Sequence, residues 1–325
     1  MQGRVAHDAP PIHSRPWRVS PVPNANVRAL AGLTLSALAA TPALGASCLP
    51  EARQPAIASG VSVGIVQSSQ GHSRDVGVIR NMFTATKAKL DASGAGPIMV
   101  LSDADVANPA ALASLKVIVL PEVKGLTRAQ RRSLLGWVKN GGGLVSLYFD
   151  GRDDAAGTPL IRLPEGWGGR SEWAELSPAV GARFVNDVYM QEASFELDAQ
   201  HPLTQAAATF CGGPVPDYHW RRKVDPQALT GELAVSASRS FQALGRLKTS
   251  KITYSKPEKR AVPGSVFAWT NTYRAGRVVK FGFNFIDAWQ PWTFDGYYKG
   301  VDPTAPDTGV ALLRGAITWA AGAPA

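Results

Sequence analysis

The stretch Thr127–Phe149, TRAQRRSLLGWVKNGGGLVSLYF, decides the fold of this chain. Thr127 with Gln130 three residues later is a capping-box pattern that begins a helix, and apolar residues continue that helix. Asn140 followed by three glycines predicts the end of the helix. The apolar run Leu144–Phe149 then predicts a buried strand. A helix followed at once by a buried strand is typical of a parallel sheet covered by helices.

Strands and helices also alternate upstream of this stretch. One-sided apolar spacing predicts a helix over Asp75–Leu90. Short apolar runs predict three strands, over Val61–Val66, Pro97–Leu101 and Lys116–Leu120. We therefore predict an α/β fold with an open, mostly parallel sheet and helices on both faces.

Beyond the fourth strand the pattern changes to a β-rich excursion, which we place at residues 150–263. Turn-rich polar sequence precedes short alternating runs, at Ala182–Tyr189, Ala193–Leu197, Leu233–Ser238 and Lys251–Tyr254. The chain then returns with a hairpin and a closing amphipathic helix, at Ser265–Asn271, Arg277–Phe285 and Thr308–Ala321. We predict one α/β domain over residues 59–322.

The first residues are typical of an export signal. Leu30–Leu44 is an apolar run of 15 residues, preceded by Arg28 and followed by small residues. The run is too short to span a bilayer comfortably, so we expect no stable membrane span. We predict a signal peptide over residues 1–46, a linker over 47–58, and a periplasmic or secreted protein.

Two features of residues 1–46 leave alternatives open. Met1–Asn26 is long and proline-rich for the start of a signal peptide, and translation that begins at Val27 would explain it. The segment also holds four arginines and one aspartate, which is compatible with a mitochondrial transit peptide.

Charge and cysteine content exclude several classes of function. The chain carries 34 Lys+Arg and 25 Asp+Glu, but no nucleic-acid-binding motif accompanies its basic clusters. We therefore predict no nucleic-acid partner. Two cysteines cannot build a four-thiolate metal site, and we expect no metal and no cofactor. In an exported protein Cys48 and Cys211 could form one disulfide, and two unpaired thiols are the alternative.

Several strings resemble the class I glutamine amidotransferase-like superfamily. Thr127–Phe149 is similar to its core. Two branches of the superfamily, the trehalose-utilisation (ThuA-like) proteins and the trimerisation domain of family 42 β-galactosidases, carry strings similar to Leu120-Pro121, His201–Thr204, Gly276–Gly282 and Leu312–Trp319. The resemblance covers residues 61–321 in outline and implies a flavodoxin-like fold.

The chain departs from that superfamily at the residues that carry its chemistry. A class I amidotransferase has its nucleophile in a Gly-x-Cys-x-Gly string and a downstream His-x-Glu pair, and this chain has neither. ThuA-like proteins tend to have a histidine where this chain has Asp150. The resemblance therefore implies the fold and not glutamine hydrolysis.

Polar side chains follow three of the predicted strands. Ligands of open parallel sheets bind in the crevice beyond the carboxyl ends of the strands. Carboxylates and imidazole can bind a cation or a sugar hydroxyl, or move a proton, so our catalytic candidates are His72, Asp150 and Asp153. Our ligand-binding candidates in the same loops are Ser68, Ser69, Glu122 and Arg152. The alternative is that these residues cap turns or face solvent.

A second candidate site is aromatic. Trp289–Tyr298, WQPWTFDGYY, packs five aromatic residues into ten positions between the last strand and the last helix. Exposed aromatic rings in a loop indicate binding, and sugar rings stack on Trp and Tyr. We therefore predict that a carbohydrate contacts four of them, Trp289, Trp292, Tyr297 and Tyr298. The alternative is a loop that folds its rings into a core of its own.

Together these observations favour an exported protein that is not an amidotransferase and that binds or processes a carbohydrate or cell-envelope polymer. One alternative is a structural or assembly module without catalysis, which would form a homo-oligomer. The other is a small-molecule hydrolase that uses the strand-end carboxylates.

Overall fold

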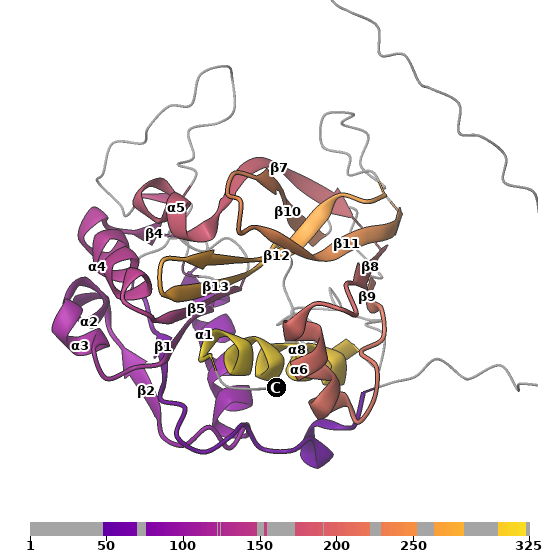
Figure 1. The fold of residues 1–325 in the computed structure, drawn as a ribbon, viewed down its shortest axis with the longest axis horizontal. Helices are drawn as coiled ribbons and strands as arrows, with labels where there is room; N and C mark the ends of the chain where they lie inside the picture. Colours follow the sequence, from indigo (N-terminus) through magenta and orange to yellow (C-terminus); the bar gives the residue numbers. More distant parts are fainter. Residues whose placement is uncertain are drawn as a thin grey trace, which may run out of the picture. The chain divides into compact units, whose positions relative to one another are not determined.

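A nine-stranded sheet forms the centre of the described chain (Figure 1). The structure, a computed structural model, describes residues 48–69, 76–121, 123, 125–147, 153–154, 173–190, 192–221, 229–251, 263–282 and 305–322. The strand order of the sheet is β2-β1-β3-β5-β13-β12-β11-β8-β9. The expected signal peptide of residues 1–46 lies outside these residues.

One half of the sheet is parallel. Each neighbouring pair from β2 to β13 runs in the same direction. The strands are β2 (Ile98–Leu101), β1 (Val63–Val66), β3 (Val117–Pro121), β5 (Gly143–Leu147) and β13 (Gly276–Phe281). The strands predicted from the apolar runs upstream of residue 150 are therefore confirmed.

The other half is antiparallel, and this corrects the predicted mostly parallel sheet. Each neighbouring pair from β13 to β9 runs in opposite directions. The added strands are β12 (Val266–Tyr273), β11 (Gln242–Lys251), β8 (Glu192–Leu197) and β9 (Tyr218–Arg221). Only Arg274 and Ala275 separate β12 from β13, and a connection this short forces the predicted hairpin.

Three of the strands described within residues 150–263 belong to the main sheet. Strands β8, β9 and β11 extend that sheet, while β7 (Ala182–Met190) and β10 (Leu229–Ser236) pair with each other. The same region contains a helix that the sequence analysis missed, α6 (Pro202–Cys211). Its start follows a helix signal, because His201 caps it and Pro202 occupies its first position.

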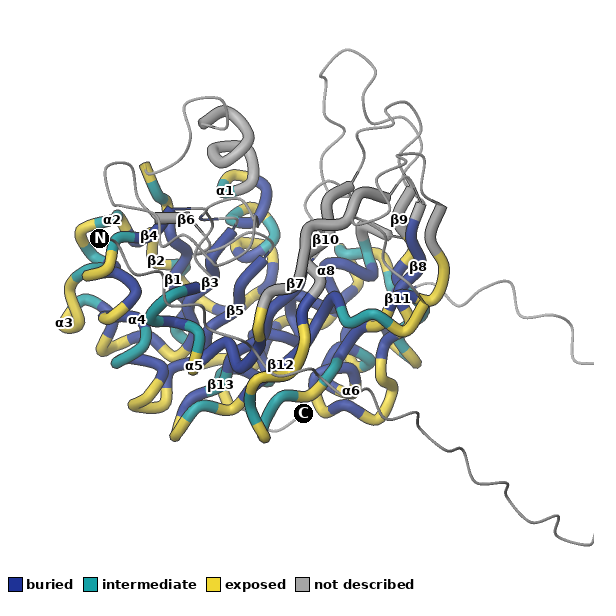
Figure 2. Tube along the Cα trace, turned by 90° about the horizontal axis from the view of Figure 1, so that it is seen from above, coloured by how far each residue is buried: buried dark blue, intermediate teal, exposed yellow. Residues whose placement is uncertain are grey.

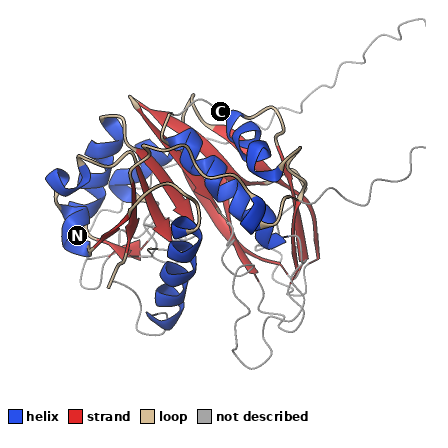
Figure 3. Ribbon diagram, turned by 90° about the horizontal axis from the view of Figure 1, so that it is seen from below, coloured by secondary structure: helices blue, strands red, loops and turns tan. Residues whose placement is uncertain are grey.

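Helices cover both faces of the sheet, as predicted (Figure 3). One face packs against α1 (Val76–Asp91), α6 and α8 (Ala305–Ala320). The other packs against α2 (Asp103–Ala107), α3 (Pro109–Leu112), α4 (Arg128–Lys139), the short 3-10 helix η2 (Ala174–Leu176) and α5 (Ser177–Val180). Strand β3 contributes Val117 and Val119 to the first core, and Ile118 and Leu120 to the second. Burial on both faces explains why the strands read as unbroken apolar runs (Figure 2).

Helix α4 begins and ends where the sequence predicts. Thr127 Oγ1 accepts a hydrogen bond from the Gln130 backbone N–H, and Gln130 Oε1 accepts one from the Thr127 backbone N–H. Asn140 is the C-cap residue of α4. Gly141 then has a φ of 107°, a left-handed conformation that favours glycine.

Two further glycines allow helices to approach the sheet closely. A Cβ atom at Gly143, the first residue of β5, would overlap the carbonyl oxygen of Ala320 at the end of α8. A Cβ atom at Gly276, the first residue of β13, would overlap the carbonyl oxygen of Val138 in α4. Bare backbone at these two positions therefore lets one helix pack tightly on each face.

Residues 48–58 are packed onto the α/β domain, which differs from the expected linker. The side-chain amide of Gln54 donates to the carbonyl oxygen of Asp307 in α8 at 2.9 Å. The buried Ile57 donates its backbone N–H to Ser93 at 2.8 Å. Arg314 of α8 donates to the carbonyl oxygens of Gln54 and Pro55.

A disulfide joins Cys48 to Cys211 across 163 residues of sequence. Both residues are buried in the core on the α8 side of the sheet. This confirms one of the two alternatives that the sequence left open. Among the described helices, none is both long and apolar enough to cross a membrane.

The packing at Gly143 can be tested by substitution. Gly143→Ala should lower the free energy of unfolding by about 1–3 kcal/mol, because the added methyl group overpacks the contact with α8. Gly136→Ala is the matched control, since a Cβ there has no atom within 4 Å and alanine favours the helix. That control should raise the free energy of unfolding by up to about 1 kcal/mol. Urea denaturation measures both changes, and two equally stable variants would contradict the proposed contact.

The disulfide should contribute strongly to stability because it closes a long loop of the unfolded chain. Replacing Cys48 and Cys211 together by serine should lower the free energy of unfolding by about 2–5 kcal/mol. Chemical denaturation of the oxidised protein and of the double variant measures the difference. An unchanged transition midpoint, with and without a reductant, would show that the bond is not formed in solution.

Candidate functional site

Two of the predicted ligand-binding serines form a cluster at the carboxyl end of β1. Ser68 Oγ donates to Asp103 Oδ1 at 2.7 Å. The backbone N–H and the hydroxyl of Ser69 donate to Asp103 Oδ2 at 2.8 and 2.7 Å. Asp103 is the first residue of α2, which follows β2. Its carboxylate therefore ties together the chain segments that leave two neighbouring strands.

Gln130 connects this cluster to α4. Its Nε2 donates to the backbone oxygen and to Oδ1 of Asp103, at 3.1 and 3.0 Å, while its Oε1 accepts from Thr127 at 2.6 Å. One side chain thus completes the capping box of α4 and binds the start of α2. We call Ser68, Ser69, Asp103 and Gln130 the strand-end cluster. The hydrogen bonds within this cluster brace the loops, and ligand binding by Ser68 and Ser69 stays a prediction.

Asp153 lies at the same edge of the sheet. Strand β6 (Asp153–Asp154) pairs in parallel with β4 (Gly125–Leu126), so Asp153 stands opposite Gly125 just before α4. The backbone that follows β5 therefore returns beside the loop that follows β3. The other candidates lie outside the described residues and stay predictions: His72, Glu122, Asp150, Arg152, Trp289, Trp292, Tyr297 and Tyr298.

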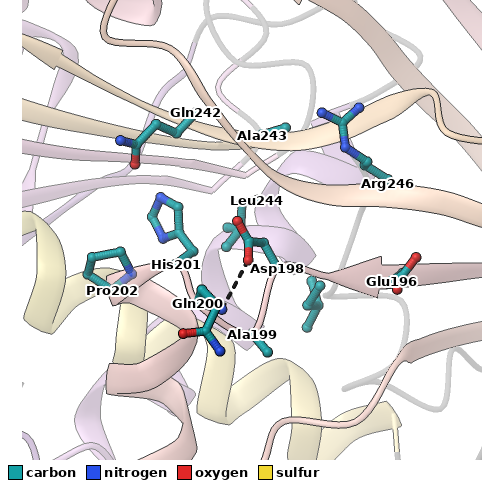
Figure 4. Close-up of a pocket in the computed structure, with 11 residues that line it drawn as sticks. Glu196, Asp198, Ala199, Gln200, His201, Pro202, Gln242, Ala243, Leu244 and Arg246 are labelled. Carbon is teal, nitrogen blue, oxygen red and sulfur yellow. Dashed lines mark hydrogen bonds between the residues drawn. The ribbon is translucent and has the colours of Figure 1, made fainter. Parts of the chain in front are cut away.

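The described residues contain a pocket that the sequence analysis did not find. It has a volume of about 790 Å³ and lies between the end of β8, the start of α6 and the start of β11 (Figure 4). Its hydrogen-bonding residues are Glu196, Asp198, Gln200, His201, Gln242 and Arg246. Its other residues are Leu197, Ala199, Pro202, Ala243 and Leu244. We call it the β8–β11 pocket.

The β8–β11 pocket lies in the antiparallel half of the sheet. Strands β3, β5, β13 and β12 separate β11 from β1, which leads into the strand-end cluster. The first residue of β11, Gln242, pairs with Thr270 of β12, and Thr270 pairs with Val279 in the middle of β13. The pocket therefore belongs to a different part of the sheet from the strand ends at which we predict a site.

A hydrogen-bonded turn carries the polar side chains on one wall of the pocket. The backbone N–H of Asp198 donates to the carbonyl oxygen of Leu244 in β11 at 2.9 Å, and the backbone oxygen of Asp198 accepts from the His201 backbone N–H at 3.1 Å. Asp198 Oδ1 accepts from the Gln200 backbone N–H at 3.0 Å (Figure 4). The turn therefore holds Asp198 and Gln200 at fixed positions beside β11.

His201 ends this turn and anchors it. Its Nδ1 accepts from the Leu203 backbone N–H at 3.0 Å, and its Nε2 lies 2.7 Å from Thr270 Oγ1 in β12. The residue is only 3% exposed. Burial lowers the pKa of His201 below its usual value of 6.5, although the negative charge of Asp198 and a hydrogen bond with the side chain of Gln242 oppose this. His201 is thus a neutral cap of α6, with its proton on Nε2.

Opposite this turn, β11 contributes the other polar side chains. Gln242 and Arg246 are exposed, and the Arg246 guanidinium donates to the carbonyl oxygen of Gly264 at 3.0 Å. Arg246 stands across the ladder from Glu196 of β8. No group of three His, Cys, Asp or Glu side chains that could hold a metal occurs within the described ranges. The arrangement can form hydrogen bonds to an uncharged polar molecule from both walls.

One sequence signal could have located the pocket. His201–Thr204 resembles strings of other proteins, and histidine before proline at the start of an apolar run is also compatible with a capped helix. The polar residues of β8 and β11 gave no such signal, because alternation of polar and apolar residues is ordinary in a strand with one exposed face.

The topology defines the class of fold. Taken in chain order, the parallel strands β1, β2, β3, β5 and β13 are arranged 2-1-3-4-5, which is the flavodoxin-like order. The antiparallel strands extend that sheet beyond β13. The protein is therefore a flavodoxin-like α/β protein with an antiparallel extension.

Comparison with solved structures agrees with this class. The chain is similar to a ThuA-like protein from Bacteroides uniformis, with 14% identity, a TM-score of 0.50, and coverage of 82% of this chain and 92% of that chain. A ThuA-like protein from Parabacteroides merdae has 16% identity and a TM-score of 0.48, and the match covers 81% of this chain and 91% of that chain. A β-galactosidase from Bacillus circulans has 12% identity and a TM-score of 0.49. The match covers 81% of this chain and 32% of that chain, so the chain spans about a third of that enzyme.

The likeness to the Bacteroides uniformis protein bears out the resemblance to ThuA-like proteins at the level of the fold. No protein-family model matches the chain, and no curated protein matches it.

The strand-end cluster can be tested through Asp103. Asp103→Ala removes the acceptor of several hydrogen bonds and should lower the free energy of unfolding by about 1–3 kcal/mol. Asp91→Asn is the control, because Asp91 is exposed and forms only an i,i+4 ion pair with Lys87 among the described residues. That change should cost less than about 0.5 kcal/mol. If the two variants were equally stable in urea denaturation, the cluster would not brace the loops.

Proposed function

We propose that this protein binds a carbohydrate, or a carbohydrate-containing polymer of the cell envelope, in the β8–β11 pocket. The observation that carries the proposal is the pocket itself, which is open, about 790 Å³ in volume and lined from two sides by hydrogen-bonding groups. Ligand sites of small molecules are typically about 300–1,000 Å³.

The chemistry of the lining suits a molecule with many hydroxyl groups. A sugar hydroxyl both donates and accepts, so a sugar site needs acceptors and donors close together. Asp198 and Glu196 supply carboxylate acceptors, while Gln200 and Gln242 supply amides that can do either. Leu244 and Pro202 supply apolar surface for the C–H faces of the ring. The mixture of both signs of charge makes a simple anion a poorer match.

We further propose that the protein is exported. The Cys48–Cys211 disulfide supports this, because structural disulfides persist mainly in oxidising compartments. The apolar run Leu30–Leu44 and the small residues after it provide a signal that would direct export.

Glutamine hydrolysis is not part of the proposal. Cysteine-dependent amidotransfer needs a thiolate nucleophile. The chain has two cysteines, and the disulfide uses both. Catalysis by Asp150 and His72 at the strand ends stays a prediction. A second contact with a polymer through Trp292 of the aromatic loop also stays a prediction.

Binding can be tested on oligosaccharides of glucose, galactose, mannose and N-acetylglucosamine immobilised on an array. For the glycan with the strongest signal, Gln242→Ala should weaken binding about fivefold, the effect of losing one hydrogen bond worth about 1 kcal/mol. Gln205→Ala is the matched control, since Gln205 is an exposed glutamine on α6 outside the pocket. It should leave binding unchanged.

Two results would overturn this function. The first is absence of binding to every glycan by a protein that is folded and oxidised. The second is equal loss of binding in the Gln242 and Gln205 variants. Self-association in sedimentation, together with absent glycan binding, would support the assembly-module alternative instead.

A further inference from the structure

We propose that His201 is a positioning residue whose neutral imidazole holds one wall of the β8–β11 pocket in place, and that protonation of the ring releases this wall. The inference rests on the proposed function only for its consequence, which is pH-dependent ligand binding. The structural switch itself stands on the hydrogen bonds around the ring.

Both ring nitrogens have defined roles. Nδ1 accepts from the backbone N–H of Leu203, so this nitrogen must carry no proton. Nε2 lies 2.7 Å from the hydroxyl of Thr270, which can accept the remaining ring proton. Only one of the three protonation forms of histidine satisfies both contacts at once. The surroundings therefore select the neutral form with its proton on Nε2.

The ring is also enclosed on its other sides. Its plane lies near the indole of Trp319 in α8, with the ring centroids 5.9 Å apart. The charged group that acts on the ring is Asp198 from the turn. Arg246 and Glu196 line the other end of the pocket (Figure 4). Arg277 of β13 lies over the indole of Trp319, 5.3 Å from its ring centroid. Burial of the ring disfavours the imidazolium, whereas the charge of Asp198 and a hydrogen bond with the side chain of Gln242 favour it.

A second proton on the ring would have to go to Nδ1. An N–H group would then face the N–H group of Leu203, and the capping hydrogen bond would be lost. The first turn of α6 and the Asp198–His201 turn share this anchor. Asp198 and Gln200 would lose their fixed positions beside β11. The polar groups on this wall of the pocket would then no longer be held in place for a ligand.

The direction of the pH effect follows from the lowered pKa. The unfolded chain binds the proton near pH 6.5, whereas the buried ring binds it only at lower pH. The stabilisation from the neutral ring is therefore complete above about pH 6.5 and is lost as the pH falls toward the pKa of the folded protein.

His201→Asn keeps the capping hydrogen bond of α6 but removes the titratable imidazole. Asparagine is among the best helix N-caps, and its Oδ1 can accept from Leu203 without titrating. His201→Ala removes both properties. Nuclear magnetic resonance can follow the imidazole signals of His201, and hydrogen exchange can follow the protection factor of the Leu203 amide, from about pH 4 to pH 8.

In the natural protein we expect the protection factor of Leu203 to fall with the same midpoint as the His201 titration. In His201→Asn it should stay level, and in His201→Ala it should be about fivefold lower at neutral pH. The amide of Val119, in the core strand β3, reports any global unfolding. A fall in Leu203 protection that is identical in the natural protein and in His201→Asn would overturn the switch.

The consequence for binding is measured separately with maltotetraose, a glucose tetramer, and with the strongest glycan from the array. The natural protein should bind at least about fivefold more weakly below the His201 midpoint than at neutral pH, while His201→Asn should lose less. Absence of glycan binding at every pH would reject the proposed function and leave the coupling between His201 and Leu203 to be judged on hydrogen exchange alone.

Discussion

The structure depends on the close approach of two helices to the amino ends of two neighbouring strands. Gly143 and Gly276 leave room there for the last turn of α8 on one face and for α4 on the other. A sheet covered on both faces must keep both helices near enough to exclude water from the core. Because β5 and β13 pair directly, the two contacts occur on adjacent strands and set the distance between helix and sheet on both faces at the amino ends of these strands.

The parallel half of the fold could be predicted from the sequence because its signals are local. The capping box at Thr127, the glycines after Asn140 and the apolar runs of the strands each depend on a few consecutive residues. The antiparallel half could not be placed in the same way. Alternating runs show that strands exist, but their partners are set by contacts far apart in sequence, such as β11 with β8.

The candidate sites show the same division. The rule that ligands bind at the carboxyl ends of parallel strands selected Ser68 and Ser69, which form a brace with Asp103. The pocket lies where β8, α6 and β11 meet, and no consecutive stretch of sequence contains all three. Only the antiparallel extension creates that meeting point. A fold rule derived from parallel sheets therefore could not indicate it.

The disulfide also gives the chain a covalent topology that spans the parallel and the antiparallel halves of the sheet. The bond between Cys48 and Cys211 turns the residues between them into a covalent ring that contains β5 and β8. In the finished sheet these two strands are separated by β13, β12 and β11, all of which belong to the linear tail after the ring. The ring by itself thus has an incomplete sheet with a gap three strands wide. The sheet is complete only when the tail fills that gap, so strands synthesised after the ring join its two parts into one sheet.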